Sequence, residues 1–171
     1  MKRALITALA IGAALPAGAG PPELQTQGAV IYLADNLDEA DNLGWCIDTI
    51  GRGFAETLQA HSCKPQGGDV QFSYDAESRQ IRSVAFDGKC MAVIDPDAPS
   101  VPFGLLDCDP DALEQRFGFD AGLITLEDAE DTCVVVGEDS RSAGPFMSRD
   151  LTLQPCSDAP PTHATWVEQK G

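Results

Sequence analysis

Six cysteines are the residues of this chain whose type and spacing could do chemistry, either by binding a metal ion or by forming disulfides. They fall into three pairs of similar internal spacing: Cys46 and Cys63, Cys90 and Cys108, and Cys133 and Cys156. A zinc site would need closer spacings, such as C-x-x-C, or paired histidines, and neither accompanies these cysteines. We therefore predict disulfides and no metal or other cofactor.

The cysteine pairs recur at a fixed period, because their first members are 44 and 43 residues apart. Six cysteines allow fifteen connectivities, but only pairing within each repeat keeps the three copies equivalent. An aromatic residue follows each second cysteine by nine or ten residues: Phe72, Phe117 and Trp166. A period of this length is typical of repeat architectures. We predict three lobes whose rings meet in a common core.

Short strand-like runs, each bounded by Gly, Pro, Asp or Asn, are the elements that must position these residues. There are four such runs per lobe: 29–33, 45–50, 57–62 and 70–74, then 81–86, 90–94, 103–107 and 116–119, then 123–126, 133–136, 151–154 and 165–167. Twelve short strands predict an all-β protein. Threefold repetition favours a closed barrel, because closure removes exposed sheet edges.

The first 19 residues have the three parts of a secretory signal peptide. Lys2 and Arg3 precede an apolar run, and Ala17-Gly18-Ala19 matches a cleavage site. We expect a secreted or periplasmic protein, in a compartment where paired cysteines oxidise. Residues 20–27 are expected to be an N-terminal linker, and residues 28–171 one domain, with lobes at about 28–75, 76–120 and 121–171.

The formal net charge is −16, and removal of Lys2 and Arg3 with the signal peptide would lower it to −18. Such a charge argues against nucleic acid or an anionic membrane surface as a partner. The apolar run near the N-terminus is too short to span a bilayer, so no membrane insertion is predicted.

The sequence resembles the ricin B-type β-trefoil lectins over about residues 28–169. The stretch 80–91, QIRSVAFDGKCM, matches the entry into a lobe, and Cys46-Ile47-Asp48 matches the family's cysteine-hydrophobic-aspartate start. Gln115-Arg116-Phe117 is a Q-x-W variant, and the copies at 70–72 and 164–166 are further eroded. The resemblance implies a β-trefoil that binds carbohydrate.

The resemblance also implies a sugar site in the first lobe, where Asp48 would accept hydroxyl hydrogen bonds and His61 would supply the stacking ring. Gln59 and Asp69 would orient the sugar, and Gln59 and His61 share one face of a strand. An imidazole in place of a larger ring, and an Asp in place of an amide, predict weak binding. The alternative is that both aspartates are turn residues and His61 is an ordinary surface histidine.

The same positions have lost the pattern in the other two lobes. They hold Ala92, Gly104 and Leu106 in the second lobe, and Val135, Thr152 and Gln154 in the third, where His163 takes the polar position. At most one sugar site is therefore expected.

Other functional classes have little support in the sequence. The chain has only two histidines and no G-x-S-x-G or H-E-x-x-H motif, so we do not expect an enzyme. Residues 107–111, DCDPD, lack the Gly and Glu of a calcium loop, which favours a solvated turn over a weak ion site. Two alternatives remain open: a degenerate trefoil that binds a partner protein, and a hydrolase inhibitor that presents Arg141 on the long 137–150 loop.

Overall fold

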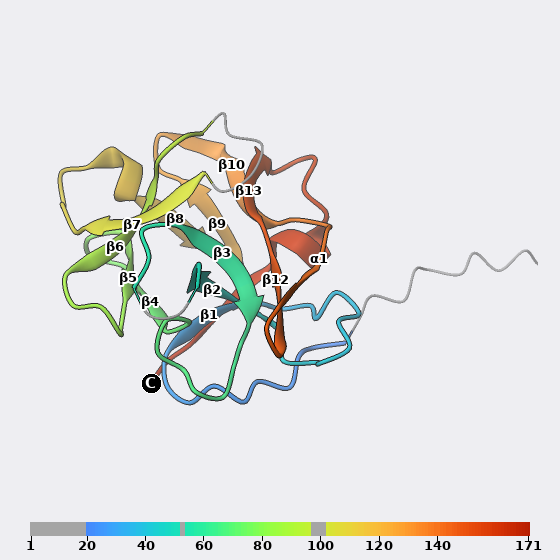
Figure 1. Cartoon of the computed structure of the whole chain (residues 1–171). Coiled ribbons are helices and arrows are strands. Elements are labelled where there is room, and N and C mark those ends of the chain that lie inside the picture. The colour runs from blue at the N-terminus through green and yellow to red at the C-terminus, as the bar shows by residue number, and fades with distance from the viewer. Residues whose placement is uncertain (1–19, 52–53, 97–101) are drawn as a thin grey trace, which may run out of the picture.

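The computed structural model describes residues 20–51, 54–96 and 102–171 (Figure 1). The predicted signal peptide, residues 1–19, lies outside the described residues. The regular secondary structure of the described part is almost all β-strand, and its four-strand repeats form a β-trefoil, as the sequence predicted. No helix in this part of the chain is long and apolar enough to cross a membrane.

All twelve predicted strands are present, with bounds that differ from the predicted ones by a few residues. The first lobe contains β1 (Val30–Leu33), β2 (Trp45–Thr49), β3 (Leu58–Ser62) and β4 (Phe72–Asp75). The second contains β5 (Gln80–Ser83), β6 (Lys89–Val93), β7 (Phe103–Asp107) and β8 (Phe117–Asp120). The third contains β9 (Leu123–Leu126), β10 (Ala129–Val136), β13 (Leu151–Pro155) and β14 (Trp166–Gln169). Two short helical turns, η1 (Leu113–Gln115) and α1 (Pro161–Ala164), precede β8 and β14.

The segment 137–150, predicted as a long loop, instead forms a hairpin of two further strands, β11 (Arg141–Ala143) and β12 (Phe146–Arg149). Gly144 turns the hairpin with a φ of 70°, in the left-handed region that glycine enters without strain. The hairpin leaves its own lobe, because β12 pairs with β3 of the first lobe (Figure 1). The twelve-strand prediction was therefore short by two strands.

Each strand pairs with its neighbours in one of three sheets. The largest has the order β11-β12-β3-β2-β1-β14, so it combines strands of the first and third lobes. Three strands of the second lobe pair with β4 in the sheet β4-β5-β6-β7, and β8 joins strands of the third lobe in the sheet β13-β10-β9-β8. In each lobe the strand that contains the first cysteine pairs with the strand that leads to the second, as β2–β3, β6–β7 and β10–β13. The first of these pairs contains the candidate site residues Asp48, Gln59 and His61.

The three repeated aromatic residues lie in one hydrophobic core. Phe72 and Phe117 are fully buried and Trp166 is 2% exposed. All three belong to the same cluster of buried side chains, together with residues of every sheet. The indole N–H of Trp166 donates to the Val134 carbonyl at 2.9 Å, so its one polar group is satisfied. This confirms the prediction that the rings fill the centre of the molecule.

The three disulfides pair as the repeat predicted. Cys46–Cys63, Cys90–Cys108 and Cys133–Cys156 have Cα–Cα distances of 5.1, 4.9 and 5.0 Å. Each bridge closes a loop of a size that stabilises a fold by about 3 kcal/mol in the chain-entropy model. The first bridge also holds Lys64, the residue after Cys63, next to β2, where its ammonium contacts Asp48.

Residues 20–27, predicted as a linker, contain no strand but lie against the first lobe. The Glu23 N–H donates to the Asn42 carbonyl at 2.9 Å. The hydroxyl of Thr26 donates to the Lys64 carbonyl at 2.8 Å, and Thr26 is only 3% exposed. This segment therefore helps to fix the backbone at Lys64.

Candidate functional site

The register of the cysteine hairpins places equivalent residues of the three lobes opposite one another. In the first lobe Asp48 of β2 lies opposite Gln59 of β3, and Cys46 lies opposite His61. The corresponding pairs are Ala92 with Gly104 and Cys90 with Leu106 in the second lobe, and Val135 with Thr152 and Cys133 with Gln154 in the third. Only the first lobe has a carboxylate, an amide and an imidazole at these positions.

Asp48 is a carboxylate that is completely buried. Among the described residues, neither of its oxygens has a hydrogen-bond partner. The Lys64 ammonium and the His61 ring lie beside it, with Nζ and Nδ1 both 3.6 Å from Oδ2. Burial raises the pKa of Asp48 to about 7, and although the Lys64 ammonium opposes this rise, the Asp69 carboxylate adds to it. Asp48 is therefore held in an environment that penalises its charge.

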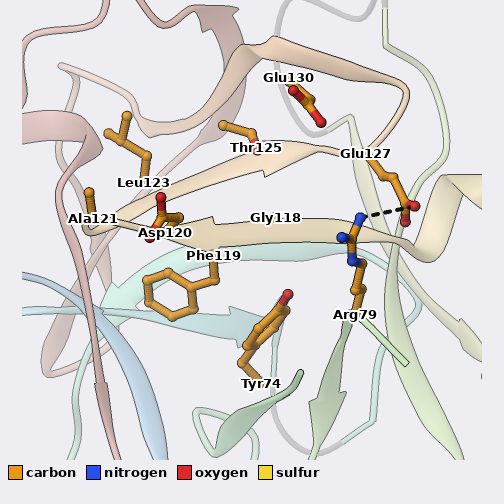
Figure 2. A pocket seen from close by; sticks show the side chains of 10 residues that line it. All are labelled: Tyr74, Arg79, Gly118, Phe119, Asp120, Ala121, Leu123, Thr125, Glu127 and Glu130. Atoms are coloured by element: carbon orange, nitrogen blue, oxygen red, sulfur yellow. Dashed lines mark ion pairs between the residues drawn. The ribbon is translucent and has the colours of Figure 1, made fainter. Parts of the chain in front are cut away.

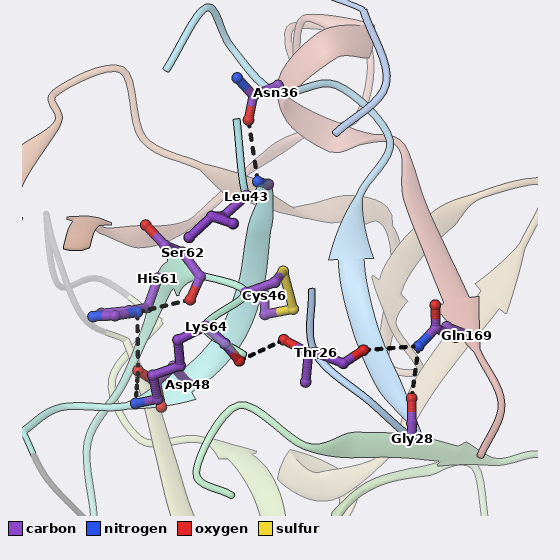
Figure 3. Close-up of a disulfide and its surroundings, with 12 residues drawn as sticks. Thr26, Gly28, Asn36, Leu43, Cys46, Asp48, His61, Ser62, Lys64 and Gln169 are labelled. Atoms are coloured by element: carbon purple, nitrogen blue, oxygen red, sulfur yellow. Dashed lines mark hydrogen bonds and ion pairs between the residues drawn. A yellow bond between two sulfur atoms is a disulfide. The ribbon is translucent and has the colours of Figure 1, made fainter. Parts of the chain in front are cut away.

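Lys64 is the site residue that sequence reasoning missed. Its ammonium lies between two carboxylates, 2.6 Å from Oδ1 of Asp69 and 3.6 Å from Oδ2 of Asp48. The lysine side chain is 13% exposed and covers Asp48 (Figure 3). The sequence held one clue: Lys64 follows Cys63, and the disulfide to Cys46 brings that position beside β2.

His61 has a defined hydrogen bond that sets its chemistry. Its Nδ1 lies 2.9 Å from the Ser62 carbonyl, and because a carbonyl can only accept, Nδ1 carries the proton (Figure 3). Burial lowers the pKa of His61, which keeps the ring neutral at neutral pH. In a neutral imidazole with a protonated Nδ1, Nε2 is an acceptor. His61 can thus accept a hydrogen bond from a hydroxyl group.

These residues border a cavity of about 610 Å³ between β3 and the β11–β12 hairpin. Its polar side chains are Gln59, His61, Lys64 and Gln66 of the first lobe, and its apolar ones include Pro145 and Phe146 of the third. Asp48 and Asp69 do not line it, because they lie behind Lys64. The structure thus brings the four predicted residues together, with Gln59 and His61 at the cavity and both aspartates in contact with Lys64.

Different residues occupy the corresponding positions of the other two lobes. In the second lobe, a Cβ built on Gly104 would overlap the Ile94 side chain, so Ile94 fills the corresponding space. In the third, Nδ1 of His163 lies 2.7 Å from the Val136 carbonyl, and the residues facing each other are Val135 and Thr152.

A second cavity, of about 490 Å³, lies between the β4–β5 and β8–β9 hairpins (Figure 2). Several of its polar groups are paired within the protein. Arg79 contacts Glu127 at 3.1 Å, and the Tyr74 hydroxyl donates to the Phe117 carbonyl at 2.9 Å. The Tyr74 ring meets Phe119 edge to face at 5.6 Å. None of the predicted site residues lies here.

Residues 107–111 form a turn that is held by side-chain contacts. Oδ1 of Asp109 accepts from the Asp111 N–H at 2.9 Å, and Asp107 pairs with Lys89 at 2.8 Å. Across the described part of the chain, no group of three or more His, Cys, Asp or Glu side chains is placed to hold a metal ion.

Several solved structures have a similar fold. The C-terminal half of an earthworm R-type lectin in complex with GalNAc is 14% identical, with a TM-score of 0.59, over 84% of this chain and 99% of that one. The β-trefoil lectin of the Vibrio vulnificus hemolysin/cytolysin, with N-acetyl-D-lactosamine bound, is 16% identical, with a TM-score of 0.56, over 84% of this chain and 94% of that one. Cytolethal distending toxin from Actinobacillus actinomycetemcomitans is 15% identical, with a TM-score of 0.54, over 83% and 90%.

No protein-family model and no curated protein matches the sequence. At identities of 14–16% the structural matches bear on the fold alone. Together with the three disulfide-linked lobes, they show that the chain is a β-trefoil.

Proposed function

We propose that this protein is a lectin-like, carbohydrate-binding module with a single site in its first lobe. The observation that carries the proposal is Asp48, a fully buried carboxylate whose oxygens lack hydrogen bonds among the described residues. Such a group is costly unless something satisfies it. It lies one side chain away from a cavity of about 610 Å³, a size typical of small-ligand sites. Lectins of this fold, with GalNAc or N-acetyl-D-lactosamine bound, support the ligand class.

In the proposed mode of binding, sugar hydroxyls donate to Asp48 and His61 while the Gln59 amide donates and accepts. Lys64 covers Asp48, but its shorter contact is with Asp69, at 2.6 Å against 3.6 Å. A hydroxyl that donates to Asp48 therefore replaces the weaker contact, and Lys64 keeps its stronger partner. Asp69 orients the site through Lys64 rather than by touching the sugar.

Binding through this site is expected to be weak. The carboxylate must be charged to accept strong hydrogen bonds, and burial disfavours its charged form. Since the other two lobes lack the site residues, the protein gains no avidity from a second site on the same chain.

The proposal is tested with the oxidised protein, by glycan-array screening followed by NMR titration of the best glycan and of GalNAc and N-acetyl-D-lactosamine. We expect binding in the millimolar to micromolar range that falls at least tenfold in Asp48→Asn and in Gln59→Ala. Thr152→Ala is the matched control, because Thr152 holds the position of Gln59 in the third lobe, and it should bind like the wild type. Binding that survives Asp48→Asn, or no binding to any glycan, would contradict the proposal.

Export is part of the proposal, with residues 1–19 as a cleaved signal peptide. Three disulfides support it, because disulfides persist in oxidising compartments. We expect the protein recovered from its native cell to begin at Gly20, which N-terminal mass spectrometry would check. An N-terminus at Met1 would refute cleavage.

A second candidate function, binding of a partner protein, is favoured by exposed apolar side chains where the first and second lobes meet. Phe54 is 46% exposed and packs on Phe86, while Ile94 is 56% exposed over Gly104. Exposed apolar groups of this kind mark interaction surfaces when they form a patch. The inhibitor alternative has less support, because Arg141 lies in a paired strand and contacts Asp150 at 2.7 Å. Failure of every glycan to bind would leave the partner protein as the better candidate.

A further inference from the structure

The first-lobe cavity has two chemically different walls that come from different lobes. Its first-lobe wall carries hydrogen-bonding groups, namely Gln59, His61, Lys64 and Gln66. Its third-lobe wall consists of residues 143–146 in the β11–β12 hairpin, Ala-Gly-Pro-Phe, and has no polar side chain. A ligand that fits must present hydroxyl groups on one side and an apolar surface on the other.

We propose that Phe146 is the ring on which the sugar packs, so that the binding site is shared between the first and third lobes and its specificity is set by the hairpin. This inference rests on the proposed function. It assigns to Phe146 the stacking role that the sequence suggested for His61, and leaves His61 with a hydrogen-bonding role. The ligand class it implies is a pyranose, whose C–H face packs on an aromatic ring while its hydroxyls reach the polar wall.

The position of Phe146 relative to His61 supports this division of roles. The two rings meet edge to face, with centroids 5.8 Å apart and planes at 64°. Phe146 is half-buried and therefore presents part of its surface to the cavity. His61 is 6% exposed and already bonded to the Ser62 carbonyl, so it has little free face to offer for stacking.

The hairpin is held firmly enough to serve as a binding wall. Its strand β12 pairs with β3, with Ser148 opposite His61. The Met147 N–H donates to Oγ of Ser62 at 3.0 Å, which fixes the residue next to Phe146. Binding walls that are ordered beforehand lose less entropy when a ligand binds.

Buried Arg149 anchors the base of the same hairpin. Its guanidinium donates to the carbonyls of Gly137 and Glu138, at 3.2 and 2.8 Å, and lies over the Trp45 ring at 4.7 Å. Trp45 is part of the main core, so the third-lobe wall is tied directly to the first lobe. The geometry of the cavity is therefore set by both lobes together.

The test is an NMR titration of the oxidised protein with the glycan selected by the array, in the wild type and in three variants of Phe146. We expect Phe146→Ala to lower affinity at least tenfold and Phe146→Leu to lower it as well, because an aliphatic group lacks a flat face. Phe146→Tyr should bind within threefold of the wild type. Phe54→Ala is the matched control, since Phe54 is a partly exposed ring that does not line this cavity.

A second readout does not depend on how the variants fold. In wild-type protein with labelled phenylalanine, intermolecular NOEs should connect sugar C–H protons with the Phe146 ring. This inference alone would be overturned if the wild type binds through Asp48 but shows no such NOEs, and if the Phe146→Ala variant binds as tightly as the wild type. A wild type that binds no glycan would instead overturn the proposed function, and this inference with it.

Discussion

Asp48→Asn should raise the free energy of unfolding by up to about 4 kcal/mol at pH 8 and leave it almost unchanged at pH 3. The pKa of Asp48 rises from 3.8 to about 7 on folding, chiefly because the carboxylate is buried. The folded protein therefore holds this proton more tightly than the unfolded chain. The resulting stabilisation is complete below pH 3.8 and is lost as the pH rises to about 7. Asparagine keeps the shape of the side chain and never carries the charge.

The measurement is chemical denaturation of both oxidised proteins from pH 3 to pH 9. The quantity of interest is the difference between them at each pH, because it isolates the effect of the substitution. Asp107→Asn is the control, since the Asp107 side chain is 91% exposed, and its difference from the wild type should stay small at every pH. A difference for Asp48→Asn that does not change between pH 4 and pH 8 would show that Asp48 does not titrate in this range.

Lys64→Met should lower the free energy of unfolding by about 3 kcal/mol at pH 8, because it leaves two largely buried carboxylates without their shared cation. Asp69 is 8% exposed and Asp48 is fully buried. Methionine preserves most of the apolar stem, so the loss reports on the charge. At pH 5 the loss should be smaller, because Asp48 is then protonated in the folded protein.

The double variant Lys64→Met/Asp48→Asn separates the two partners of Lys64. If Lys64 offsets the charge of Asp48, the double variant should regain a large part of the stability lost in Lys64→Met. Lys170→Met is the control, because the Lys170 side chain is 84% exposed and lies 3.9 Å from its carboxylate partner. A double variant whose change in the free energy of unfolding equals the sum of the two single-variant changes would refute coupling between Lys64 and Asp48.

The fold could be predicted from the sequence because its determinants repeat. Three cysteine pairs and three following aromatics recur at one period, and each copy reinforces the assignment of the others. The structure confirmed the three cysteine pairs and the twelve predicted strands. It also confirmed that the three repeated aromatic residues, Phe72, Phe117 and Trp166, are buried. These features depend on local spacing and on symmetry, which a single sequence displays.

The features that the sequence did not reveal break the symmetry. The hairpin at 137–150 has no counterpart among the described residues of the other lobes. Its strand β11 is the polar run Arg-Ser-Ala, without the alternation that marks a half-buried strand. Phe146 reaches His61 only because β12 pairs with a strand more than 80 residues earlier in the chain. The role of Lys64 likewise depends on three-dimensional charge pairing, since Asp48 on β2 and Asp69 in the loop after β3 both contact its ammonium.

The departures in the first-lobe motif have a physical explanation in the structure. Asp69 stands where the resembled family prefers an amide, and it serves as the close partner of Lys64 at 2.6 Å. A small ring at position 61 leaves room for Phe146 to approach from the third lobe. In the proposed site the polar groups therefore come from the first lobe and the aromatic ring from the third.

The measurement that tests the central claim most directly is a map of backbone amide chemical shifts during titration of the ¹⁵N-labelled oxidised protein with the glycan selected by the array. We predict that the largest changes occur in β2, in β3 and Lys64, and in the β11–β12 hairpin, and that they saturate at a single affinity. Saturating changes around the cavity of Tyr74 and Arg79, or in the second-lobe hairpin β6–β7, would contradict a first-lobe site.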